Sequence, residues 1–184
     1  MLHQDALALL RAWTPPDVGQ EDVRRRYVAH LEARPDGLRR SCFPEHITAS
    51  TLVLSADGER VLLTLHAKAQ AWFQMGGHCE EGDTTLAGAA LREAIEESGV
   101  SGLRPDPVPV QLNAHPVPFC DPRGTVHHLD VRFLAVAPED AAHAVSEESL
   151  DVRWWPWDDL PTQDADMHDL VRLARARRAT RAGV

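Results

Sequence analysis

The hydrophobic positions of the chain repeat with two periods, which predict where helices and strands lie. Near the start, Leu7 and Leu10 recur at helical spacing, so residues 3–13 are predicted to form a short helix. Pro15 and Pro16 end it, because proline lacks a backbone donor and restricts the residue before it. The chain is therefore expected to begin with a helix and a sharp break.

Two more helices follow from the same spacing. Val23, Tyr27 and Leu31 lie about one turn apart, which predicts a helix over residues 17–33. Residues 162–182 are predicted to form the closing helix, and the arginines near its C-terminal end complement the helix dipole. Helices thus flank both ends of the chain.

The middle of the chain has strand-like segments in which apolar and polar residues alternate. These segments are residues 47–55, 60–66, 71–75, 105–117 and 126–137. The first two flank a turn signal at Asp57 and Gly58 and predict a hairpin. Prolines in the fourth segment favour an edge strand, whereas the unbroken alternation of the fifth favours a central one. Helices at both ends with strands between them predict an α/β fold, a sandwich around a mixed sheet.

Composition and charge narrow the class of protein. The 184 residues suit one domain, and the hydrophobic (43%) and charged (26%) fractions are ordinary for a soluble protein. A net charge of −9 argues against general binding to nucleic-acid backbones. Three widely spaced cysteines, Cys42, Cys79 and Cys120, match neither a disulfide framework nor CxxC zinc spacing. With no apolar leader or membrane-length run, we expect a cytoplasmic protein without a membrane partner.

The most informative segment is residues 76–100, GGHCEEGDTTLAGAALREAIEESGV. In a helix, Glu93, Glu96 and Glu97 share one face, and such close carboxylates repel unless a cation neutralises them. Magnesium prefers oxygen ligands of this kind. An acidic run alone is most often a solvated helix face. The glycine pair directly before this helix favours a site instead.

This segment resembles the signature of the Nudix hydrolase family: glycine, five residues, an acid, a spacer, then Arg-Glu-apolar-any-Glu-Glu-any-Gly-apolar. The matching positions are Gly77, Asp83, Arg92, Glu93, Ala94, Glu96, Glu97, Gly99 and Val100. The Nudix box therefore spans residues 77–100. It departs from the family in having Asp83 for the usual Glu and one extra residue between Asp83 and Arg92. We interpret that residue as a longer loop or helix start around residues 84–88.

The resemblance implies a Nudix-type α/β/α sandwich around a mixed β-sheet. Residues 1–45 would then be an N-terminal helical extension and residues 46–184 the Nudix hydrolase domain. Residues 146–161 resemble the family's late segment, an acidic loop followed by a strand. The extension could be a lid or packing element, a homodimer contact or part of a substrate wall.

The resemblance also implies a reaction, the metal-dependent hydrolysis of a diphosphate linkage in a nucleoside diphosphate linked to another moiety, or in a related compound. Mg²⁺, with Mn²⁺ as the alternative, would screen the phosphate charge and acidify a water molecule. Glu93 and Glu97 are the first candidate metal ligands and Glu96 the third, and the family pattern adds the carbonyl of Gly77. Arg92 is expected to orient the carboxylates.

Catalytic roles are predicted for Glu93, Glu96, Arg92 and Glu147. The general base is either Glu93 within the box or a residue of the later loop, where Glu147 and Glu148 lie. A solvated acidic turn is the plain alternative for that loop.

Three further residues are candidates for substrate binding: His78, His127 and Asp130. His78 follows the glycine pair, and His127 begins a His-His-x-Asp pattern in which Asp130 could orient an imidazole or join a metal shell. An isolated histidine is more often structural, so these residues are predicted only to line the substrate site.

Two alternatives to hydrolysis stay open. His78 and Cys79 after Gly77, with Trp72 nearby, resemble the active site of isopentenyl-diphosphate isomerase, which shares the Nudix fold. A Nudix-fold regulator could instead bind a nucleotide without cleaving it. The intact box glutamates favour hydrolysis of a small-molecule diphosphate. Nucleoside triphosphates, ADP-ribose-like sugars, dinucleoside polyphosphates and non-nucleotide diphosphates all fit.

Overall fold

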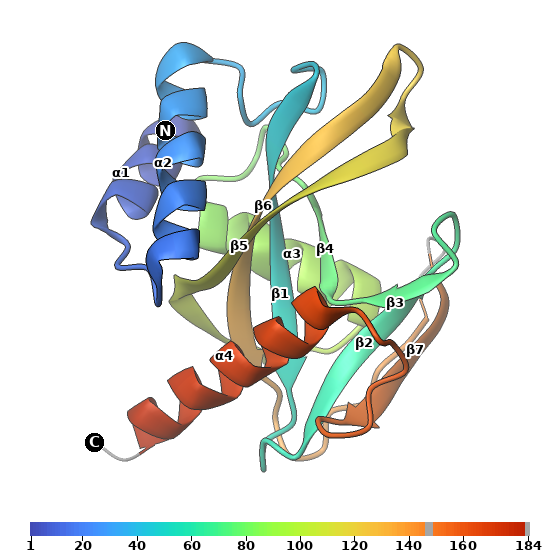
Figure 1. Ribbon diagram of the computed structural model, residues 1–184. Coiled ribbons are helices and arrows are strands. Elements are labelled where there is room, and N and C mark those ends of the chain that lie inside the picture. Colours follow the sequence, from blue (N-terminus) through green and yellow to red (C-terminus); the bar gives the residue numbers. More distant parts are fainter. Residues whose placement is uncertain (146–148, 183–184) are drawn as a thin grey trace.

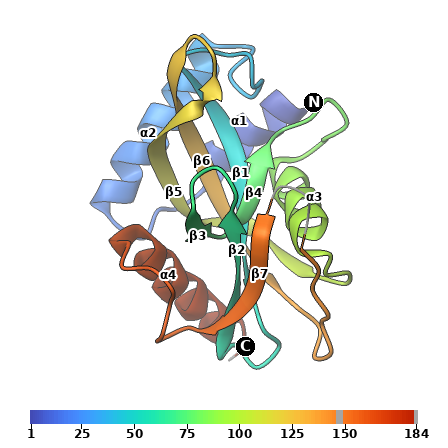
Figure 2. The same cartoon turned by 90° about the vertical axis from the view of Figure 1, so that its right-hand side faces the viewer.

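The computed structural model describes residues 1–145 and 149–182. Its elements, in chain order, are α1 (Leu2–Ala12), α2 (Val18–Ala33), β1 (Glu45–Leu54), β2 (Arg60–His66), β3 (Ala71–Phe73), β4 (Met75–His78), α3 (Leu86–Ser98), β5 (Arg104–Asp121), β6 (Gly124–Val136), β7 (Ser149–Pro156) and α4 (Ala165–Ala182). All strands belong to one sheet, which α3 and α4 cover from opposite sides (Figures 1 and 2). The predicted α/β/α sandwich with helices at its N-terminal end is therefore confirmed.

The sheet is mixed. Its main strand order is β3-β2-β1-β6-β5, while β4 pairs with β1 and β7 pairs with β2. β1 and β6 run parallel, whereas β1 and β2 form the predicted antiparallel hairpin. β5 lies at an edge and β6 between β5 and β1, as the proline-interrupted and unbroken patterns predicted.

One predicted strand, residues 71–75, forms two strands. β3 pairs with β2 and β4 pairs with β1, so the chain changes partner at Gln74. Gln74 is buried, and its amide donates to Ser50 Oγ and to a carboxylate oxygen of Asp130, both at 3.2 Å. These bonds satisfy the N–H groups of the Gln74 side chain, whereas its Oε1 is buried and has no hydrogen-bond partner among the described residues.

Residues on the two faces of β6 pack against different helices. Leu129, Val131 and Phe133 belong to a buried cluster with residues of α1, α2 and α3. Leu134 points the other way and belongs to a cluster with α4, including Leu170. This alternation of side chains places the polar residues between them on the α4 side. No described helix is both long and apolar enough to cross a membrane.

The N-terminal helix α1 contacts the start of the box helix. Asp5 accepts a hydrogen bond from the backbone N–H of Leu86 at 2.8 Å, and Thr85 accepts one from Gly88 at 3.1 Å. Two side chains, one of them 81 residues away, therefore satisfy free N–H groups at the start of α3.

Replacing Asp5 with Ala should lower the free energy of unfolding by about 1 kcal/mol, because the N–H of Leu86 loses its acceptor. Urea unfolding measures the loss, and hydrogen exchange at Leu86 locates it. Asp17→Ala is the matched control, since Asp17 caps α2 through Gln20 at 2.9 Å and should leave Leu86 protected. Equal exchange at Leu86 in both variants would contradict the capping role.

Candidate active site

The box helix packs close to the sheet through small residues. Ala89, Ala90 and Ala94 of α3 are fully buried, and Thr51 of β1 donates to the carbonyl of Ala90 at 3.0 Å. Gly99 ends the helix in the left-handed conformation, with a φ of 67°. This packing fixes the neighbouring helix face, which carries Arg92 and the three box glutamates, beside β4.

Two glycines of β4 bring backbone up to these carboxylates. The N–H of Gly76 donates to a carboxylate oxygen of Glu97 at 3.1 Å. A Cβ at Gly77 would lie only 2.7–2.8 Å from the carboxylate atoms of Glu93. A side chain at Gly77 would therefore displace that carboxylate, which explains the chemical need for glycine there.

Arg92 is the centre of the box contacts. Its guanidinium donates to Glu93 at 3.0 Å, to Glu96 at 2.9 Å and to the carbonyl of His78 at 3.0 Å. Two further bonds reach the carboxylate of Asp83, at 3.2 and 3.1 Å. In this arrangement Arg92 orients two box carboxylates and fixes the backbone that follows Gly77.

Asp83 lies beside Arg92, and its side chain is only 8% exposed. Its carboxylate also accepts from the N–H of Glu80 at 2.8 Å. Burial would raise its pKa, but the hydrogen bonds from Arg92 keep the pKa of Asp83 below its ordinary value. The helix α3 begins at Leu86, with Thr85 as its N-cap, and continues without interruption to Ser98.

The three glutamates differ in exposure. The Glu93 side chain is 15% exposed, whereas that of Glu96 is 57% exposed. Burial raises the pKa of Glu93, and the nearby Arg92 partly offsets the rise. Together with Glu97, they concentrate more negative charge than Arg92 can neutralise. Their oxygens and the Gly77 carbonyl are the donor types that a hard divalent cation prefers.

The predicted substrate-binding residues lie in different places. His78 points to the face of the sheet that also carries His128, because their ring centroids are 5.0 Å apart. His127 is exposed on the other side of β6, since neighbouring residues of a strand alternate. Their substrate roles stay predictions. Glu147, the predicted base of the later loop, lies outside the described residues.

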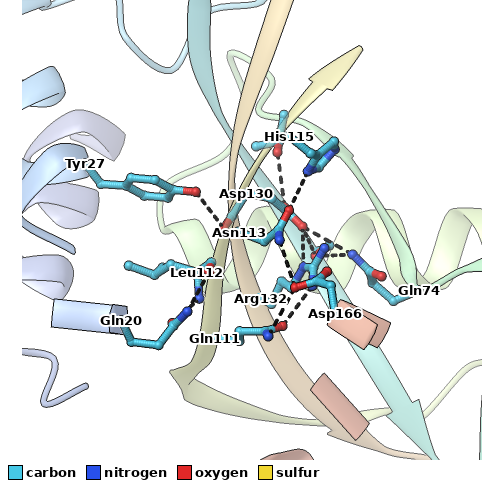
Figure 3. A network of polar contacts seen from close by, with 12 residues as sticks. Gln20, Tyr27, Gln74, Gln111, Leu112, Asn113, His115, Asp130, Arg132 and Asp166 are labelled. Atoms are coloured by element: carbon cyan, nitrogen blue, oxygen red, sulfur yellow. Dashed lines mark hydrogen bonds and ion pairs between the residues drawn. The ribbon is translucent and has the colours of Figure 1, made fainter. Parts of the chain in front are cut away.

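Asp130 is buried within a polar network on the α4 side of the sheet (Figure 3). Its carboxylate accepts from Thr48, Ser50, Gln74 and Arg132. Arg132 in turn bonds Gln111 at 2.8 Å and Asp166 of α4 at 2.5 Å. Sequence reasoning missed this network. The one feature of the sequence that indicated this network was the placement of Asp130 and Arg132 on the same face of a predicted central strand.

A second group missed from the sequence is formed by His46, His78, Cys120 and His128, here named the His/Cys cluster. Burial lowers the pKa of His78 to about 4 and that of His128 to about 3, and the neighbouring imidazoles add to both shifts. The rings are therefore neutral at neutral pH. Each residue comes from a different strand, so no short sequence motif indicates the cluster.

A family model described as NUDIX domain matches residues 44–174, which include the whole glycine loop and box helix. This chain belongs to the NUDIX family. The match assigns it to the Nudix pyrophosphohydrolases and leaves residues 1–43, with α1 and α2, outside the matched region. No curated protein matches the NUDIX chain in sequence.

Several solved structures share the Nudix fold. A Caenorhabditis elegans (C. elegans) Ap4A hydrolase is 20% identical with a TM-score of 0.57, covering 75% of this chain and 98% of its own. The E. coli dihydroneopterin triphosphate pyrophosphohydrolase is 17% identical with a TM-score of 0.55, covering 71% and 95%. The NUDIX domain of Shewanella oneidensis NrtR, complexed with ADP ribose, is 22% identical with a TM-score of 0.53, covering 76% and 92%. At these identities the likeness shows the fold.

Proposed function

We propose that this Nudix protein uses Mg²⁺, or Mn²⁺, to hydrolyse a diphosphate linkage in a nucleoside diphosphate joined to another moiety. The observation that carries the proposal is the approach of the Glu93 and Glu97 carboxylates to the glycine backbone of β4. The similar structures named above are those of an Ap4A hydrolase, a dihydroneopterin triphosphate pyrophosphohydrolase and a NUDIX domain complexed with ADP ribose. These molecules all contain phosphoanhydride bonds, which supports the proposed substrate class.

The residues of the box fit a hard divalent ion. Glu93, Glu96 and Glu97 supply carboxylate oxygens, and Gly77 supplies a carbonyl with no side chain in the way. When bound, the ion neutralises phosphate charge, polarises phosphoryl oxygens and acidifies water. The excess negative charge of the box attracts such an ion, because Arg92 provides only one positive charge for these three carboxylates.

The protein side chains have separate roles in this proposal. Arg92 holds Glu93 and Glu96 in place through charge-assisted hydrogen bonds. Glu93 is the candidate proton acceptor within the box, since its raised pKa makes it more basic than an ordinary exposed carboxylate. Glu147 is the alternative base. His78 and His127 are proposed substrate contacts. The predicted contact Asp130 is buried, and its carboxylate already accepts hydrogen bonds from Thr48, Ser50, Gln74 and Arg132, so it is not proposed to touch the substrate.

A substrate panel tests the proposal. The purified protein is incubated with Ap4A, ADP-ribose, nucleoside triphosphates and isopentenyl diphosphate, each with Mg²⁺, Mn²⁺ or EDTA, and products are separated by anion exchange. We expect cleavage of at least one nucleotide in the presence of metal and no cleavage with EDTA. Conversion of isopentenyl diphosphate to its isomer would favour the isomerase alternative. Nucleotide binding without any product would favour the regulator.

A further inference from the structure

The His/Cys cluster gathers four donor side chains from four strands. His46 lies on β1, His78 on β4, Cys120 on β5 and His128 on β6. One nitrogen or sulfur atom from each lies within 4.8 Å of all the others. The centroids of the three imidazole rings are 5.0 Å apart in every pair. The side chains therefore surround a common point.

Two distances between donor atoms of the cluster match those of a tetrahedral metal shell. Cys120 Sγ lies 3.5 Å from His78 Nε2 and 3.4 Å from His128 Nε2. Zinc binds nitrogen at about 2.0–2.1 Å and sulfur at about 2.3 Å, so neighbouring donors of a tetrahedron lie about 3.3–3.6 Å apart. Small side-chain movements would bring the remaining donors to this spacing.

His46 adds an independent observation. Its side chain is fully buried, and its Nδ1 lies 3.0 Å from the carbonyl of Cys42. A carbonyl accepts only, so Nδ1 carries the proton and Nε2 presents a lone pair. Nε2 is buried and has no hydrogen-bond partner among the residues that the structure describes. A buried acceptor without a partner is unfavourable, and metal-ligating histidines are commonly oriented by a bond of this kind to a backbone carbonyl.

We propose that His46, His78, Cys120 and His128 bind one zinc-type transition-metal ion at a site separate from the carboxylates of the box. Three imidazoles and a thiolate select Zn²⁺ and similar ions, whereas Mg²⁺ prefers oxygen. Four protein ligands fill a tetrahedral shell, which is typical of a structural site.

Such an ion would join the β5–β6 hairpin to the strand that carries the glycine loop. The hairpin end of β5 and β6 extends away from α3 and α4 (Figure 1). Cys120 lies in a stretch of β5 where the register with β6 is irregular. The His78 side chain would bind the ion, while its carbonyl accepts from Arg92. The ion would thereby fix the backbone directly after Gly77.

Cobalt titration of the full-length protein, first stripped of metal with a chelator, tests the site. We expect one equivalent of Co²⁺ to give visible bands of a tetrahedral complex and a thiolate-to-cobalt charge-transfer band, with Zn²⁺ displacing both. Cys120→Ser should lose the charge-transfer band and weaken Zn²⁺ binding by more than about 10-fold. Cys79→Ser is the matched control, because Cys79 follows His78 but is not part of the cluster.

A second arm separates this site from the proposed Nudix chemistry. Glu97→Gln should bind Co²⁺ with the wild-type spectrum even if its turnover is lost. Zn²⁺ should raise the Tm of wild type and Glu97→Gln but not that of His128→Ala. A spectrum unchanged by Cys120→Ser, or absent from the wild type, would overturn the proposal, whereas a spectrum lost only in Glu97→Gln would assign the ion to the box.

Discussion

Glu97→Gln is expected to lower metal-dependent turnover by more than about 100-fold while the protein stays folded, because loss of even an outer-shell partner of a metal costs about 10–100-fold. The amide oxygen of Gln can still accept the hydrogen bond from Gly76, so the contact between α3 and β4 is kept. Only the charge that holds the cation is lost. The measurement is kcat/KM on the best substrate of the panel, with circular dichroism to monitor folding.

Glu81→Gln is the matched control for this charge change. Glu81 is an exposed residue of the loop before α3, so the variant removes one carboxylate from the same segment, residues 77–100, without touching the proposed ligands. It should keep near wild-type turnover. Full activity of Glu97→Gln would contradict the assignment of the box as the metal site. Equal losses in both variants would show that net charge, rather than the position of Glu97, matters.

Local patterns predicted most of the fold. The helices, the β1–β2 hairpin and the edge position of β5 all follow from periods and turn residues within short windows. The parallel pairing of β1 with β6 and the change of partner at Gln74 do not, because they depend on segments far apart in the chain. Periodicity identifies a strand but does not identify its neighbour.

The candidate site could likewise be predicted from the sequence only in part. The box could be predicted because its glycines, arginine and glutamates are contiguous and because helical geometry places Glu93 and Glu97 on one face. The cap from Asp5 to α3 could not, and neither could the His/Cys cluster, since four separate strands supply its members. Histidines that look isolated in the sequence become neighbours only when the sheet forms.

Arg132→Met should lower the free energy of unfolding by about 3–5 kcal/mol, the usual effect of removing one partner from a buried ion pair. Arg132 and Asp130 are 5% and 4% exposed, and Asp166 is the second carboxylate bound to the same guanidinium. The variant keeps an unbranched side chain about as long as the aliphatic stem of arginine but removes the guanidinium, which leaves Asp130 without its positive partner. Urea unfolding at pH 7 measures the loss. Arg172→Met, which breaks an exposed pair on α4, should cost less than about 1 kcal/mol.

The pH dependence of stability should change in the same variant. Burial alone would raise the pKa of Asp130, but Arg132 keeps it below its ordinary value. Because the pKa of Asp130 is lower in the folded than in the unfolded state, where it is about 3.9, its ionised carboxylate stabilises the wild type at pH values above 3.9. This stabilisation is lost as the pH falls from there through the folded-state pKa. In Arg132→Met burial dominates and the folded-state pKa rises, so lowering the pH towards 4 should reduce the difference in stability between the variant and wild type. A difference that stays constant from pH 7 to pH 4 would mean that Arg132 stabilises the protein through packing rather than through the charge of Asp130.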